Sequence, residues 1–188
     1  FKVPTGNIPY PIFLFVALIP WMFLANAITA ATGSVIANSS LITKINLPRE
    51  ILPISAVSSK LIDLLLASLV LVIFLIYYDI GFNFSLFFLP IVLIIHFFLI
   101  LGLSFFLSAT NVFYRDIENV LGIFLTLWMY LTPVLYPTEL IPDRLKIFFF
   151  LNPMSGLIDA YRATILYGQL PNWWSFIYSS FFSVILLI

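Results

Sequence analysis

The residues able to do chemistry are few in this sequence, and they gather in short polar segments between long apolar runs. The sequence contains no phosphate-binding loop, no HExxH zinc motif and no GxSxG nucleophile elbow. Cysteine is absent, so disulfides and thiolate metal sites are excluded. No carboxylate pair and no nucleophile beside a base stand out. We therefore expect no catalytic residue, no metal site and no cofactor bound by this chain itself.

The first polar segment, residues 41–53, mixes charged and apolar side chains with two prolines that permit only short helical pieces. It is either an ordinary interfacial loop or a short helix whose exposed face docks on a soluble partner. The residues available for docking are Lys44, Asn46, Leu47, Pro48, Arg49 and Glu50. A second segment, residues 111–119, lies on the same side if the apolar runs alternate. Its Tyr114, Arg115 and Asp116 either mark the membrane boundary, with side chains that extend toward water, or belong to the same docking surface.

The third segment, residues 128–137, combines aromatic rings with Pro133, which interrupts a backbone hydrogen bond and is expected to bend a helix. Aromatic side chains near the end of a span usually form an interfacial belt. The other interpretation is a conduit for sugars, because sugar C–H faces stack on rings and ring hydroxyls bond sugar hydroxyls. The aromatic residues concerned are Trp128, Tyr130 and Tyr136.

The fourth segment, residues 147–167, is apolar enough to suggest a span, but Asn152 and Pro153 interrupt it. Asp159 and Arg162 would also lie at depth, where a charged side chain costs about 2.5–3.5 kcal/mol on insertion scales. We therefore predict two short helices that meet at Asn152-Pro153, dip into the membrane and return. Such a path is tolerated where protein or a water-filled cavity covers it. Asp159 and Arg162 are three residues apart and can pair on one helix face.

The composition of the whole chain identifies the solvent around these segments. Apolar residues make up 63% of the chain and charged residues 9%, whereas soluble domains are about half apolar and about a quarter charged. A soluble domain of this size could not cover so much apolar surface, so membrane lipid must be the main solvent. The formal net charge of +0 provides no basic field, so we expect no nucleic-acid partner.

Five apolar runs approach the roughly 20 residues that a spanning helix needs. They are residues 12–31, 57–77, 86–109, 120–136 and 173–188, and a polar loop occupies 32–56. The runs do not alternate in polarity as barrel strands would. The predicted fold class is all-α: a polytopic helical membrane protein. It forms one domain over residues 1–188, with a re-entrant helix pair at 138–171 before the last span.

Two ionisable residues inside the runs need separate interpretations. His96 has no carboxylate near it in the sequence, so we expect a neutral, hydrogen-bonded packing histidine. Asp63 should face water or be paired. If the spans alternate, four basic residues lie on each side of the membrane, so the positive-inside rule does not decide the orientation. The density of charge around residues 44–60 favours that side as cytoplasmic.

Taken in order, several segments resemble one family, the ABC-2 type permeases that export O-antigen, capsular polysaccharide or teichoic acid. The O-antigen type is the most similar. The segments are residues 9–11 (PYP) with 20–21 (PW), 46–53 (NLPREILP), 113–116 (FYRD), 132–137 (TPVLYP), and 152–153 (NP) followed by 160–162 (AYR).

The resemblance implies six spans, cytoplasmic termini and a homodimer in the cytoplasmic membrane of a bacterium, in contact with membrane lipid. It also implies a lipid-linked glycan substrate and separate ATP-binding-cassette ATPase subunits, which would bind ATP and Mg²⁺. This chain would then lack an amino-terminal amphipathic helix, the first span and a short tail. The two polar segments of the first side would couple to the ATPase. The conduit and its gate would be formed by Trp128, Tyr130, Pro133, Tyr136, Asn152, Pro153, Asp159, Tyr161 and Arg162.

Other functions remain open beside this one. Within the family, the alternative is an ABC-2 exporter of a drug or lipid. Outside it, the alternatives are a non-transporting membrane scaffold and an integral membrane enzyme. The enzyme needs ionisable residues gathered at one depth, which the sequence lacks, and the scaffold does not need the broken re-entrant pair.

Overall fold

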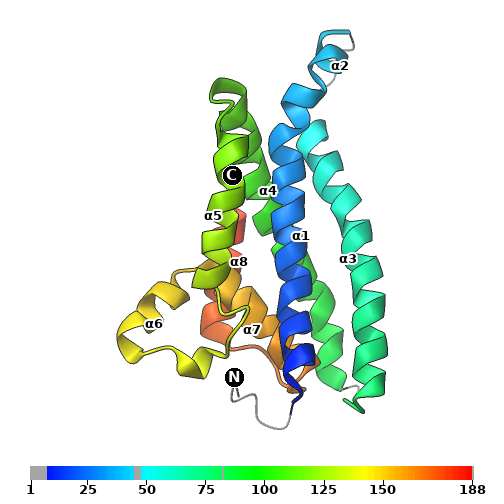
Figure 1. The fold of residues 1–188 in the computed structure, drawn as a ribbon, viewed down its shortest axis with the longest axis vertical. Coiled ribbons are helices and arrows are strands. Elements are labelled where there is room, and N and C mark those ends of the chain that lie inside the picture. The colour runs from blue at the N-terminus through cyan, green and yellow to red at the C-terminus, as the bar shows by residue number, and fades with distance from the viewer. Residues whose placement is uncertain (1–7, 45–47, 82, 188) are drawn as a thin grey trace.

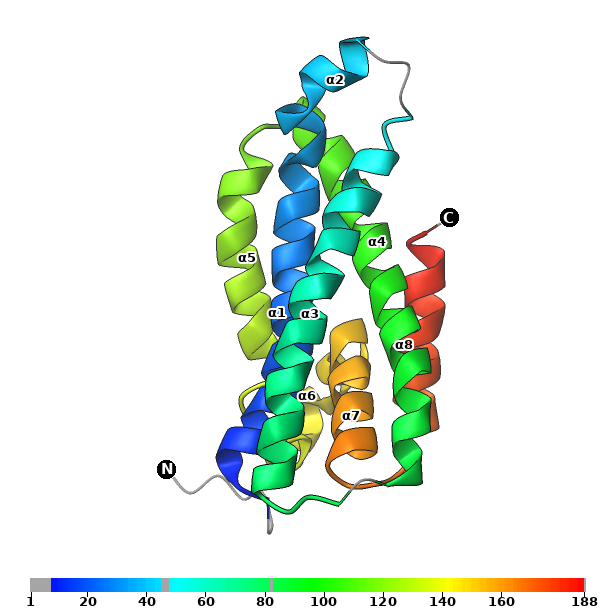
Figure 2. The same ribbon diagram turned by 90° about the vertical axis from the view of Figure 1, so that its right-hand side faces the viewer.

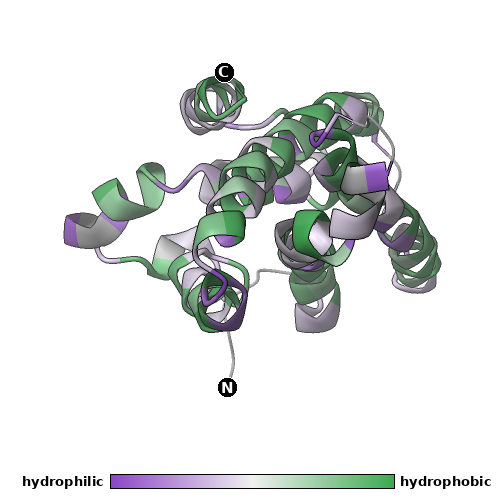
Figure 3. Cartoon of the chain, turned by 90° about the horizontal axis from the view of Figure 1, so that it is seen from above, coloured by the Kyte–Doolittle hydropathy of each residue, from purple (hydrophilic) through white to green (hydrophobic). Residues whose placement is uncertain are grey.

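The fold is a bundle of helices that run along one long axis (Figure 1). The computed structural model describes residues 8–44, 48–81 and 83–187. In these ranges the chain consists of helices and their connections without any strand, so the predicted all-α class is confirmed. Seen from one end, the helices consist mostly of hydrophobic residues (Figure 3). This is the surface expected of a multi-pass membrane protein.

In the part of the chain that the structure describes, three helices are long and apolar enough to cross a membrane: Tyr10–Ala37, Ile51–Tyr77 and Phe84–Phe113. The first two are α1 and α3, and the third consists of a 3₁₀ helix, η1 (Phe84–Phe88), that continues into α4 (Leu89–Phe113). They contain the apolar runs expected at 12–31, 57–77 and 86–109. Between α1 and α3 lies the short helix α2 (Ser39–Lys44).

The centre of the bundle is α1, which contacts α3, α4, α5 and α7. Its buried residues include Phe13, Val16, Leu24 and Ile28, each at most 1% exposed. These positions lie on one broad face of the helix, so α1 packs against its neighbours along most of its length. The other elements are therefore placed relative to α1.

The helix α5 (Ile117–Leu131) ends before the apolar run at 120–136 does. Thr132 has an extended backbone with a ψ of 140°, and Pro133 follows it. A proline drives the preceding residue out of the α region, so Pro133 terminates α5. The expectation that Pro133 bends a continuing helix is therefore wrong. Residues 132–137, which we call the 132–137 loop, instead lead to the 3₁₀ helix η2 (Thr138–Leu140).

Two short helices, α6 (Asp143–Phe150) and α7 (Pro153–Ile165), follow η2 and confirm the predicted break at Asn152-Pro153. The side-chain oxygen of Asn152 accepts a hydrogen bond from the backbone N–H of Met154 at 3.1 Å. Proline suits the first turn of a helix, where its missing N–H has no partner anyway. Figure 2 shows α7 between the lower parts of α3 and α4, with the turn to α8 (Trp173–Ile185) at the same end.

Close backbone packing joins α7 to α8 at Gly156. A Cβ added to Gly156 would lie 2.6 Å from the carbonyl oxygen of Ser175 and would also collide with the hydroxyl of Ser179. That hydroxyl donates to the carbonyl of Pro153 at 2.7 Å. Only glycine permits this approach, so α7 is fixed against α8.

Replacing Gly156 with alanine should lower the stability of the protein by about 1–3 kcal/mol, the usual cost of overpacking. The matched control is Gly122→Ala on α5, where an added Cβ meets nothing within 4 Å. The measurement is thermal unfolding of the detergent-solubilised protein. Equal melting temperatures for the two variants would contradict the packing described here.

Cysteines placed at Pro142 and Gln169, which are both exposed, should react with an impermeant thiol reagent from the same side of the membrane. The reason is that α6 and α7 leave and return to one end of the bundle. The 188 residues contain no cysteine, which keeps the background low. A cysteine at Tyr114, at the opposite end, serves as the control for the other side. Labelling of the first two positions from opposite sides would show that residues 147–167 cross the membrane.

Candidate functional site

The predicted docking residues lie at one end of the bundle, which carries both α2 and the turn between α4 and α5 (Figure 1). Asn46 and Leu47 fall outside the described residues. The remaining members of the set are exposed, as docking requires: Lys44, Pro48, Arg49, Glu50, Tyr114, Arg115 and Asp116. The structure thus places both polar segments at one end, although about 60 residues of helix separate them in the sequence.

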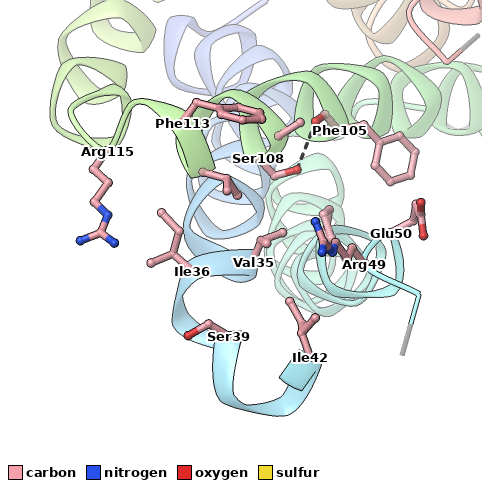
Figure 4. A pocket seen from close by; sticks show the side chains of 13 residues that line it. Val35, Ile36, Ser39, Ile42, Arg49, Glu50, Phe105, Ser108, Phe113 and Arg115 are labelled. Atoms are coloured by element: carbon pink, nitrogen blue, oxygen red, sulfur yellow. Dashed lines mark hydrogen bonds between the residues drawn. The ribbon is translucent and has the colours of Figure 1, made fainter. Parts of the chain in front are cut away.

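A cavity of about 640 Å³ lies between these two segments. The end of α1, α2, the start of α3 and the end of α4 all contribute to its wall. Figure 4 shows Arg49 and Glu50 at one side of it and Arg115 at the opposite side. Between them the wall is largely apolar, with Val35, Phe105 and others. This end therefore offers an apolar recess with charged residues at its margin.

At the other end, Arg162 on α7 is the central polar residue and is only 3% exposed. Its guanidinium donates to the backbone carbonyls of Pro133 at 2.6 Å, Val134 at 2.8 Å and Tyr136 at 3.4 Å. The same group lies 3.7 Å from the centre of the Phe13 ring. Carbonyl dipoles and the ring face both stabilise a cation. Arg162 therefore fastens the 132–137 loop to α7 and α1.

Asn152 forms a second junction at this end. Its amide nitrogen donates to the hydroxyl of Thr132 at 2.9 Å, and its amide oxygen accepts from the indole N–H of Trp128 at 3.0 Å. The Asn152 side chain also caps α7 through Met154. It therefore joins the end of α5, the 132–137 loop and the start of α7. Trp128 also packs edge-on against Trp21 of α1, with ring centres 5.7 Å apart.

The remaining residues of the predicted gate surround these two junctions. Asp159 accepts a hydrogen bond from the Thr138 hydroxyl at 3.3 Å. The Tyr136 hydroxyl donates to the backbone carbonyl of Tyr130 at 2.9 Å. The side chain of Tyr130 itself is 57% exposed. The structure therefore brings the predicted gate residues together at one end, opposite the docking residues.

His96 is fully buried, and its Nδ1 lies 3.3 Å from the hydroxyl of Tyr161. This confirms a buried, hydrogen-bonded packing histidine. Burial raises the pKa of the Tyr161 hydroxyl, so this group is a neutral hydrogen-bonding partner. Tyr161 thus joins α7 to α4. Asp63 is paired as expected, because Lys60 lies 3.0 Å away on the same helix.

Phe13 and Thr132 also belong to this site, although the sequence did not indicate them. Phe13 is one of 21 phenylalanines, and no spacing distinguishes it from the others. Thr132 lies inside the predicted 132–137 segment, but its role depends on Asn152, which is 20 residues further along the chain. Only the packed structure shows either contact.

Replacing Arg162 with methionine should release the 132–137 loop and destabilise the fold, because each carbonyl left without its donor costs about 1–3 kcal/mol. We expect faster hydrogen exchange in the loop and a lower melting temperature. The matched control is Arg144→Met on the exposed surface of α6. If the Arg162 and Arg144 variants exchange and melt alike, the guanidinium does not hold the loop.

Comparison with known proteins shows which family this chain is similar to. Residues 2–166 match the ABC-2 type transporter family. The O-antigen export system permease protein RfbA of Myxococcus xanthus is 31% identical over 173 residues, which are 90% of this chain and 66% of that protein. Two proteins of the same name from Klebsiella pneumoniae are 31% and 32% identical over 162 residues, which are 86% of this chain and 62% of theirs.

The chain therefore spans just under two thirds of the length of these curated relatives. The family match itself extends from before α1 to the end of α7, and so includes both ends of the bundle described above. On this match, the chain belongs to the ABC-2 type transporter family.

Proposed function

We propose that this chain is the membrane-spanning part of a permease subunit in an ATP-driven exporter of a lipid-linked, O-antigen-like polysaccharide. It would act in the cytoplasmic membrane of a bacterium. The observation that carries the proposal is the similarity to O-antigen export permeases over 86–90% of the chain. The arrangement of the molecule supports it, since a charged docking end and a tightly bonded loop end lie at opposite ends of one bundle.

The energy source in this proposal is a separate ATPase subunit, as the family resemblance implies, and the residues of this chain contain no phosphate-binding loop. That subunit would bind ATP and Mg²⁺ and would dock at the end that carries Arg49 and Arg115. Exposed cationic residues around an apolar recess suit a protein partner with an acidic, partly apolar surface. Closure of the ATPase subunits would then push on α2 and the start of α3.

The helix α1 is the element best suited to transmit this motion. Its 28 residues extend about 42 Å without a break. One end of α1 adjoins α2. At the other end, the ring of Phe13 lies against Arg162, and the hydroxyl of Tyr10 donates to the carbonyl of Leu135 at 3.1 Å. A displacement of α1 at the docking end therefore acts directly on the 132–137 loop. This coupling is the basis of the gating mechanism that we propose.

The loop end would act as the gate of a conduit formed by two copies of the permease. The residues proposed for conduit and gate are Trp128, Tyr130, Pro133, Tyr136, Asn152, Pro153, Asp159, Tyr161 and Arg162. Within this set, the contacts of Asn152 and Arg162 hold the gate closed, and the exposed ring of Tyr130 is available to a passing sugar. Weak stacking at several rings lets a polymer slide, because a conduit needs binding that is easily reversed.

Reversing the charge of Arg49 should uncouple ATP hydrolysis from export. Arg49→Glu places like charges at the docking surface, and a loss of about 1.4 kcal/mol there already corresponds to a tenfold change. We expect surface glycan to fall by at least that factor while the membrane fold persists. The control is Arg144→Glu, which carries the same change at the opposite end. Normal export by the Arg49 variant at matched expression would reject the docking role.

Deleting the gene in its own bacterium tests the proposed substrate. Lipid-linked glycan should accumulate inside the cell, and surface polysaccharide should disappear. Unchanged surface polysaccharide together with increased sensitivity to a drug would instead support a drug exporter of the same family.

A further inference from the structure

A cavity of about 230 Å³ lies between α1, α3, α4 and α7. The residues of its wall that the structure describes are almost all aliphatic, such as Leu71 and Leu75 of α3 and Leu89 of α4, and α7 contributes Tyr161 and Ile165. Figure 2 shows where the space arises: α3 and α4 diverge toward the loop end, and α7 lies between their lower parts. We call this space the α3–α7 cavity.

The wall of the cavity suits an apolar occupant and not water. Protein interiors are closely packed and seldom leave a space larger than a water molecule. The α3–α7 cavity exceeds the roughly 150 Å³ of an engineered apolar cavity that stays dry and takes up benzene. Two hydroxyls belong to the described wall, and both already have partners. Ser68 donates to the carbonyl of Leu64 at 2.8 Å, and the Tyr161 hydroxyl lies 3.3 Å from Nδ1 of His96.

The cavity opens onto the apolar outer surface of the bundle. Val72 of α3 belongs to its wall and is 39% exposed, so the wall reaches the surface there. Nearby along the same helix, Leu69 and Ile73 are exposed, and the helix on the other side of the cavity exposes Phe87 and Ile91. A broad exposed apolar surface on a multi-pass membrane protein faces lipid. Acyl chains are therefore the molecules that reach the opening.

The depth of the cavity matches one leaflet of a bilayer. Its wall on α3 extends from Leu64 to Leu75, eleven positions apart, which is about 16 Å of helix. The hydrocarbon core of a bilayer is about 30 Å thick, so one leaflet supplies about half of that. The deep end is Leu64, and Leu75 lies close to the rings of Tyr77 and Tyr78 at the end of α3. Tyrosine rings at the end of a span typically lie at headgroup level.

We propose that the α3–α7 cavity binds one acyl chain of a phospholipid from the leaflet at the loop end. A space of about 230 Å³ drawn out over about 16 Å is a narrow slot, so it suits an unbranched chain better than a methyl-branched polyprenyl chain. The proposal requires only that the chain lies in a membrane, so it is independent of the export function.

The bound chain would support the helix that carries Arg162. The helix α7 packs against α1, α4 and α8, whereas α3 faces it across the cavity. An acyl chain in the slot fills the space between α3 and α7 and supplies the dispersion contacts that an empty space lacks. The lipid thus becomes part of the packing around α7.

Photolabelling with a phospholipid tests the site. The full chain, with any subunits that copurify with it, is reconstituted in vesicles of phosphatidylethanolamine and phosphatidylglycerol. These vesicles also contain a phosphatidylcholine with a diazirine midway along one acyl chain, and labelled peptides are identified by mass spectrometry. We expect label at Tyr161 or Ile165, which are 4% and 8% exposed and which lipid reaches only through the cavity. Label on the exposed Ile73 serves as the internal standard for contact with bulk lipid.

Two valines on α3 provide a variant and its matched control. Val72→Phe fills the opening of the cavity, whereas Val70→Phe adds the same ring at a position that is 46% exposed and lies outside the wall. We expect Val72→Phe to lower the label on α7 about tenfold, which corresponds to ~1.4 kcal/mol of lost chain binding. The Val70 variant should keep the label on α7, and both should keep the label on Ile73.

Three results would overturn the proposal. The first is label on Ile73 without label on α7, which would mean that protein fills the cavity or that lipid does not enter it. The second is equal label on α7 in the two valine variants. The third comes from repeating the experiment with a polyprenyl phosphate that carries the diazirine: loss of the phospholipid label from α7 in favour of this lipid would assign the cavity to a polyprenyl chain.

Discussion

A guanidinium buried against backbone carbonyls organises the loop end of this protein. Arg162 bonds the carbonyls of Pro133, Val134 and Tyr136 and lies on the ring of Phe13. Each group supplies what the other lacks. The carbonyls of the loop have no donors within a helix, and the buried guanidinium has no water to bond. Neither group is tolerable there alone, so α1, α7 and the loop after α5 are held in one relation. The positions of the other residues proposed for the gate depend on this contact.

The same end shows how a polar site is built within an apolar chain. Asn152 and Arg162 each direct several bonds toward one short loop, while aromatic residues such as Trp21 and Trp128 exclude water around them. Backbone polar groups in a membrane protein need partners from within the protein. The irregular backbone at 132–137 is therefore stable only because side chains from other helices supply those partners.

The sequence alone predicted those features that have local causes. Long apolar runs indicated helices, and Asn152-Pro153 indicated a break because a capping side chain and a proline act within one turn. Contacts between residues distant in the sequence could not be predicted. Examples are the bonds of Arg162 to a loop 29 residues earlier and the contact of His96 with Tyr161, 65 residues later. The effect of Pro133 was also misjudged, since a proline bends a helix or ends it depending on whether packing continues the helix beyond it.

The several bonds of Asn152 have a consequence for how the proposed gate would open. One side chain bonds Trp128, Thr132 and the backbone of Met154, so a displacement that strains one of these bonds strains them all. A small displacement would break most of these hydrogen bonds but would hardly widen the proposed conduit. Intermediate positions are thus disfavoured relative to fully closed and fully open ones. If this junction is the gate proposed above, it would respond to a threshold force and would keep ions from leaking across the membrane while the proposed exporter is at rest.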